Sequence, residues 1–294
     1  MIKLPQAPLF GLAAIALWST NAPVAKWIFQ YYPVSYVQLL QFIGALSVFI
    51  CMHKLNKKKV QGRISLKVIL IGLIGLVGTM IFQYLAFAMA PILAANLIAY
   101  CWPLILAFMF IIAGTSNSPW ILALCSVAGF IGVSMIINTG NEVISYNDWL
   151  GYMCALLSAI CMASYSFLIG RYHVSSAQVL IPAACIGVII AGVWVAWEGV
   201  SLKLSPLIFA GLYLGVGPMG LGFLFWSIAM RKDLSGRTSL LGYLTPVTST
   251  FLLWLFGETL GLYSILGVCL VFLSCIIVGV SSGRSEKSIQ PTTL

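Results

Sequence analysis

Residues 96–104 of this chain read Asn-Leu-Ile-Ala-Tyr-Cys-Trp-Pro-Leu, and residues 239–247 read Ser-Leu-Leu-Gly-Tyr-Leu-Thr-Pro-Val. The two stretches share the spacing Leu-x-x-Tyr-x-x-Pro and lie 143 residues apart. At the same offset, Gly114 corresponds to Gly257. A shared spacing followed by a matching glycine indicates an internal repeat, so we expect two related halves.

The composition around these stretches excludes a soluble domain. Of the 294 residues, 61% are apolar and 7% are charged, whereas a soluble domain carries about 25% charged residues. A membrane-spanning helix needs about 20 consecutive, mostly apolar residues. We therefore predict an all-α membrane protein with ten transmembrane helices, at residues 8–29, 32–52, 66–90, 91–113, 119–137, 148–170, 176–197, 204–230, 234–256 and 261–280.

Ten spans divide evenly between the two halves. Residues 1–140 hold the first five spans, and residues 141–294 hold the second five with a short cytoplasmic tail. An odd number of spans per half turns the second half over relative to the first, which is the inverted-repeat architecture of many secondary transporters. The third and eighth spans are both rich in glycine, which favours close helix packing.

The basic residues predict the orientation. Under the ten-span assignment, thirteen lysines and arginines fall on one side of the membrane and only two, Lys26 and Lys203, fall on the other. Lysine and arginine accumulate in cytoplasmic loops. We therefore expect both termini to be cytoplasmic, and we attribute the net charge of +9 to topology rather than to a nucleic-acid partner.

Several of these segments resemble one family of transporters. They are Leu17-Trp18-Ser19-Thr20-Asn21, the run from Asn96 to Pro103, Tyr243-x-x-Pro246, and Gly257-Glu258. The chain is similar to the EamA type of the drug/metabolite transporter superfamily. Trp18-Ser19-Thr20 and the run from Tyr100 to Leu104 most resemble the YddG-type aromatic amino-acid exporters. The resemblance implies a bacterial inner-membrane exporter with a central cavity between its halves.

Enzymatic chemistry is not expected. The two histidines lie at loop edges, the six acidic residues lie in loops or at span ends, and the eight cysteines form no Cys-x-x-Cys pair. A metal site or an acid–base pair requires such groups close together, so we expect no catalytic residue, metal or cofactor. Proton-coupled carriers usually keep an ionisable relay in the membrane, so facilitated transport is the simpler expectation. Lys26 lies near a span end, where snorkelling is favoured over a substrate contact.

Prolines and aromatic residues indicate where a substrate would bind. Pro103 and Pro246 occupy matching places in the repeat, and interrupted helices in corresponding positions point to a midplane site. Tyrosine and tryptophan at mid-depth need partners for their polar atoms. Each residue alone could simply pack against lipid or another helix. As a set, the predicted substrate-binding residues are Trp18, Asn21, Tyr84, Asn96, Tyr100, Trp102 and Tyr165.

These features favour a secondary transporter that exports small amphipathic metabolites by alternating access, with aromatic amino acids as the first expectation. Export of other drugs or metabolites is the main alternative, and an intramembrane scaffold or enzyme is a weaker one. The expected partners are a small-molecule substrate and the lipid bilayer. The oligomeric state is left open by the sequence, and a monomer is the simplest case.

Overall fold

The computed structural model describes residues 6–55, 65–137, 148–172, 174–200, 205–233, 235–255 and 261–287. Within these ranges every regular element is helical and none is a strand. Eight of the described segments are long and apolar enough to cross a membrane: Ala7–Ile28, Val34–Leu55, Leu66–Met89, Ala94–Ile112, Pro119–Ile137, Trp149–Arg171, Ser176–Trp197 and Ile208–Lys232. The predicted all-helical, multi-pass membrane protein is confirmed.

The last two predicted spans are also helical over the residues described. Residues 234–256 contain a 3-10 helix, η4 (Arg237–Tyr243), and the helix α13 (Leu244–Leu255). Residues 261–280 fall in α14 (Leu262–Lys287). Neither is among the eight segments above, so the number ten stays a prediction. The boundary between residues 140 and 141, and most of the basic loop after Lys54, lie outside the described residues.

Over the described residues, five of the ten predicted spans consist of more than one helical element. Up to residue 140 the elements are α1 (Gln6–Trp18), α2 (Asn21–Ile28), α3 (Val34–Leu55), α4 (Leu66–Gly72), η1 (Leu73–Gly78), α5 (Thr79–Met89), α6 (Ile92–Ala99), α7 (Trp102–Ile112) and α8 (Pro119–Ile137). Before η4 the second half contributes α9 (Trp149–Arg171), α10 (Ser176–Trp197), α11 (Ile208–Leu214), η3 (Gly215–Gly222) and α12 (Phe223–Lys232).

The elements η1 and η3 are π-helical segments inside the two glycine-rich spans. Segments of this kind are rare and often lie at functional sites. Their glycines allow neighbours to approach closely. A Cβ on Gly75 would lie 2.1 Å from the ring of Tyr165, and one on Gly215 would lie 2.4 Å from the carbonyl oxygen of Gln41. The backbone of each segment thus touches another helix directly, as the glycine content predicts.

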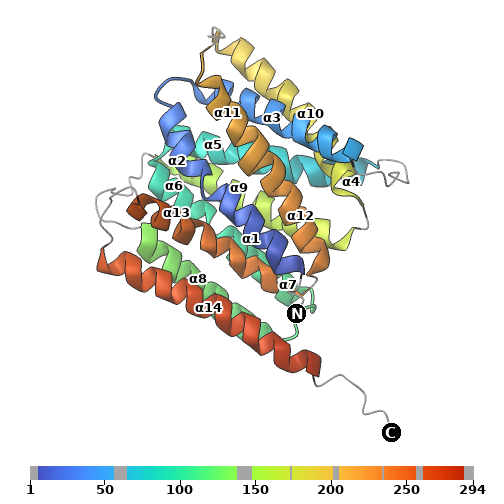
Figure 1. The fold of residues 1–294 in the computed structure, drawn as a ribbon, viewed down its shortest axis with the longest axis vertical. Coiled ribbons are helices and arrows are strands. Elements are labelled where there is room, and N and C mark those ends of the chain that lie inside the picture. Colours follow the sequence, from blue (N-terminus) through green and yellow to red (C-terminus); the bar gives the residue numbers. More distant parts are fainter. Residues whose placement is uncertain are drawn as a thin grey trace.

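The helices form a bundle in which partners come from both halves of the sequence (Figure 1). The helices α8 and α14 pack side by side along one edge, and α3 packs against α10 at the opposite edge. Between these pairs, α1 packs against α12, and α5 packs against α9. The start of α1 and the end of α14 lie at the same end of the bundle (Figure 1). The α1, α7, α9 and α12 helices meet in the interior, where the candidate site lies.

Candidate functional site

Three tryptophans from distant parts of the chain form the centre of the bundle. Trp18 ends α1, Trp102 begins α7, and Trp226 lies in α12. The ring centroids lie 6.2 Å apart for Trp18 and Trp102, 5.3 Å for Trp18 and Trp226, and 5.2 Å for Trp102 and Trp226. Two of the three pairs are edge-to-face, which is a favourable arrangement for aromatic rings. We call these three residues the tryptophan cluster.

Two of the indole N–H groups have defined acceptors. The Nε1 atom of Trp18 donates to the carbonyl oxygen of Pro218 in η3 at 2.9 Å, and that of Trp226 donates to the Ser166 hydroxyl in α9 at 2.8 Å. In a membrane interior each polar group needs such a partner within the protein. These bonds therefore anchor α1 to η3 and α12 to α9, and they fix the orientation of two of the rings.

A second group of residues is held by hydrogen bonds. The Tyr84 hydroxyl donates to the Asn21 side-chain oxygen at 3.1 Å and accepts from the Gln41 amide at 2.6 Å. The Gln38 amide in turn donates to the Gln41 side-chain oxygen at 2.9 Å. Tyr84, Gln38 and Gln41 are fully buried. We call Asn21, Gln38, Gln41 and Tyr84 the amide network, and it joins α2, α3 and α5.

Asn96 belongs to neither group. Its side-chain oxygen accepts from the Gln83 amide at 3.3 Å, and the Gln83 oxygen accepts from the Ser158 hydroxyl at 3.2 Å. This short chain connects α6, α5 and α9. It gives Asn96 a polar partner inside the bundle, but it does not bring Asn96 into hydrogen-bond contact with Asn21 or Tyr84.

The two prolines lie next to changes in helix geometry, but not as interior kinks. The helix stops after Ala99 and resumes at Trp102, which places Pro103 in the first turn of α7. Pro246 likewise lies near the start of α13, directly after η4. A proline in the first helical turn removes an N–H group that has no partner within the helix in any case. Tyr100 lies at the break and is partly buried, whereas Trp102 is buried.

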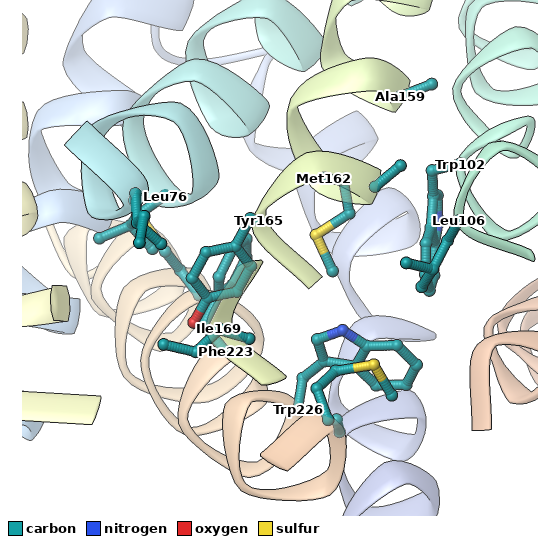
Figure 2. Packing of buried hydrophobic residues seen from close by; sticks show 14 of the residues in the cluster. Leu76, Trp102, Leu106, Ala159, Met162, Tyr165, Ile169, Phe223 and Trp226 are labelled. Carbon is teal, nitrogen blue, oxygen red and sulfur yellow. The ribbon is translucent and has the colours of Figure 1, made fainter. Parts of the chain in front are cut away.

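Tyr165 lies on the other side of Met162 from Trp102 (Figure 2). Its ring packs against Phe223 with centroids 5.8 Å apart, and it is completely buried. The hydroxyl group has no hydrogen-bond partner among the residues that the structure describes. It is directed toward Ile169 and Phe223 (Figure 2). A buried hydroxyl without a partner is costly, so this atom is a candidate contact for a ligand.

Trp18 and Asn21 belong to different helices. A spacing of three residues would place both side chains on one face of a continuous helix, but α1 ends at Trp18, and a turn at Ser19 and Thr20 separates it from α2. The helical period does not carry across such a break. Trp18 therefore joins the tryptophan cluster while Asn21 joins the amide network. The seven predicted residues fall into separate contact groups rather than one.

Sequence reasoning missed several residues of these groups. Trp226 is fully buried at the centre of the tryptophan cluster, but its position near the predicted end of the eighth span is typical of an interface anchor. Gln38, Gln41 and Gln83 were not singled out. Glutamine inside an apolar run is unusual and needs a partner, and this signal would have identified all three. No group of three or more potential metal ligands occurs in the described ranges.

Comparison with known proteins shows which protein family and which solved structure this chain resembles. The model of the EamA-like transporter family matches residues 149–280. A solved crystal structure superposes with a TM-score of 0.83 at 25% identity, covering 93% of this chain and 98% of the other. The described part of the chain has an all-helical, multi-pass membrane fold, and the match over residues 149–280 confirms the resemblance to EamA-type transporters that the sequence showed.

One relative is named more specifically than the family. The chain is 28% identical over 266 residues to the aromatic amino acid exporter YddG of Ancylobacter novellus, covering 85% of this chain and 88% of that protein. The predicted resemblance to this type of exporter is therefore confirmed. Both named similarities are to transporters.

Proposed function

We propose that this protein exports aromatic amino acids across the bacterial inner membrane. The observation that carries the proposal is the similarity to an aromatic amino acid exporter over 85% of the chain. The tryptophan cluster supports it, because indole rings offer flat apolar faces on which an aromatic side chain stacks. The predicted site residues are proposed to contact the substrate from the tryptophan cluster, from the amide network, and through Asn96, Tyr100 and Tyr165.

The direct test is efflux from loaded proteoliposomes. Vesicles that hold radiolabelled phenylalanine, tyrosine, tryptophan, leucine or lysine should release the three aromatic amino acids fastest, and protein-free vesicles provide the baseline. Export of other amphipathic drugs or metabolites is the alternative, and a panel of such compounds in the same vesicles would reveal it. Efflux of the aromatic amino acids no faster than the baseline would refute the proposal.

Alternating access between two inverted five-helix repeats, ten spans in all, is the proposed mechanism. Paired irregularities support it. At the offset of 143 residues, Leu73–Gly78 in η1 corresponds to residues 216–221, which lie inside η3. A change of helix geometry also occurs next to both Pro103 and Pro246. Corresponding breaks in the two halves are typical of carriers that rock around a central site.

Both termini are proposed to be cytoplasmic, because the basic residues concentrate on one side. Reporter fusions at positions 62 and 141 test this orientation. A reporter active in the cytoplasm should work at 62 and fail at 141, and one active in the periplasm should do the reverse. The opposite pair of results would invert the orientation of both halves.

Transport is proposed to be facilitated. The acidic residues whose side chains the structure describes, Asp148, Glu198 and Asp233, lie at helix ends. None of these three carboxylates therefore lies at mid-membrane depth, where a proton relay would be expected. Efflux should persist when an uncoupler collapses the proton gradient and the substrate gradient remains. Complete loss of efflux under that condition would mean that a coupling group exists.

A further inference from the structure

The last turn of α12 carries an arginine, Arg231, whose hydrogen bonds within the described ranges all end on neutral oxygens. Arg231 donates from Nε to the Ser227 carbonyl oxygen at 3.2 Å, and from Nη1 to the Val174 carbonyl oxygen at 2.5 Å. Its Nη2 donates to the Ser176 hydroxyl and, at 3.4 Å, to the Ser227 hydroxyl. The guanidinium is partly buried between α12 and the start of α10. These contacts orient the cation without neutralising it.

The carboxylate nearest in sequence is engaged elsewhere. One oxygen of Asp233 accepts from the backbone N–H and the hydroxyl of Ser235, and the other accepts from the backbone N–H of Thr238. These bonds place Asp233 as the cap of the turn before η4. Burying a charge without an opposite charge is costly. The neighbourhood of Arg231 is therefore electrostatically suited to a carboxylate from outside the chain.

A second group points to the same place. The buried Tyr165 hydroxyl lacks a hydrogen-bond partner in the described part of the chain, and the Tyr165 ring packs against Phe223 with centroids 5.8 Å apart. Phe223, Ser227 and Arg231 follow one another at intervals of four residues, so they lie along the same side of α12. Because α9 packs against α12, an unpartnered hydroxyl donor and a cation lie on neighbouring helices. Guanidinium and phenol donors are a suitable pair for a carboxylate, which accepts several hydrogen bonds at once.

We propose that Arg231 and Tyr165 form a site for the α-carboxylate of the transported amino acid. The proposal rests on the proposed function and adds the group that recognises the charged end of the substrate. The tryptophan cluster serves the aromatic end: Trp226 lies five residues before Arg231 on the same helix. A bound carboxylate takes over donors that now bond to Val174 and Ser176, so substrate binding loosens the tie between α12 and α10.

Paired ligands test the carboxylate site directly. Thermal stabilisation of the purified protein is measured with phenylalanine against phenylalaninamide, leucine against leucinamide, and benzoate against benzamide. Each pair exchanges a carboxylate for a neutral carboxamide on the same side chain, and the benzoate pair does so without an amino group. The wild type should bind the carboxylate member more tightly, on the order of tenfold for a charge-assisted contact. Arg231→Gln should abolish that preference while leaving the affinity for the amide members unchanged.

Three further variants separate recognition from structure. Tyr165→Phe removes only the unpartnered hydroxyl, so the protein should fold normally and lose part of the carboxylate preference. Arg231→Lys keeps the positive charge, so this variant should retain part of the carboxylate preference. Arg171→Gln is the matched control: the Arg171 guanidinium stacks 3.7 Å from the centroid of the Phe167 ring. This change should affect both members of each pair equally.

The outcomes distinguish this site from the proposed function. A carboxylate preference that Arg231→Gln and Tyr165→Phe leave intact would overturn the site, even if the protein exports aromatic amino acids. Absence of stabilisation by any carboxylate would overturn it as well. A preference that both variants reduce would support the site, even if proteoliposomes released no aromatic amino acid and the proposed function failed.

Discussion

The tryptophan cluster and the amide network are both buried, but different forces hold them together. The cluster is defined by ring contacts at 5.2–6.2 Å between centroids, with two indole N–H groups bonded to acceptors outside it. The network is a chain of side-chain hydrogen bonds at 2.6–3.1 Å. A substitution in the tryptophan cluster lowers stability because it leaves a cavity, whereas one in the amide network does so because it leaves polar atoms unpaired. Substitutions can therefore tell the two regions apart.

The largest effect is expected in the tryptophan cluster. Trp226→Ala removes the one ring that lies within 5.3 Å of both others and creates a cavity in a fully buried position. The free energy of unfolding should fall by about 3–5 kcal/mol, measured by thermal denaturation in detergent. Trp120→Ala is the control, because Trp120 is 81% exposed. Comparable losses for both variants would show that the cluster does not stabilise the bundle.

A smaller effect is expected in the amide network. Tyr84→Phe keeps the ring but removes the hydroxyl that bonds to both Asn21 and Gln41. The two amides then lose a partner, and stability should fall by about 1–2 kcal/mol. Tyr152→Phe, which loses only a 3.5 Å contact to Asp148, should change little. Equal stability of Tyr84→Phe and wild type would mean that the network is not an energetic unit.

The next prediction separates binding from stability within the tryptophan cluster. Trp102 is buried, so truncation to alanine would also leave a cavity, and Trp102→Phe is the sharper change. Loss of the indole should raise the substrate concentration for half-maximal efflux about fivefold, the value of one aromatic contact of about 1 kcal/mol. Trp120→Phe should leave it unchanged. If only Trp120→Phe raises the substrate concentration for half-maximal efflux, the substrate binds outside the tryptophan cluster.

The smallest effect is expected at Lys26. Its side chain is exposed near the end of α2, as snorkelling to the interface predicts. Lys26→Gln should change stability by less than about 0.5 kcal/mol and leave efflux unaltered. A clear loss of efflux with unchanged stability would assign Lys26 a role in substrate contact. Lys26 would then be an alternative to Arg231 as the cation that binds the carboxylate.

Sequence reasoning worked best where the determining property is local. The apolar runs predict where the described spans lie to within a few residues, and the proline positions mark where α7 and α13 begin. The glycines of the third and eighth spans predict close packing, which the surroundings of Gly75 and Gly215 show. The π-helical geometry of η1 and η3 was not anticipated, because nothing in local composition distinguishes it from an ordinary glycine-rich helix.

By itself, the sequence determined the class of the protein, the positions of its apolar helices and the kind of transporter it resembles, because hydropathy, proline placement and short motifs are properties of neighbouring residues. Only the tertiary structure decided which side chains meet. Trp18 bonds to Pro218 across 200 residues, and Tyr84 bonds to Gln41 and Asn21 on other helices. Such contacts depend on how helices rotate and dock, and a break of two residues after Trp18 is enough to send it and Asn21 to different partners.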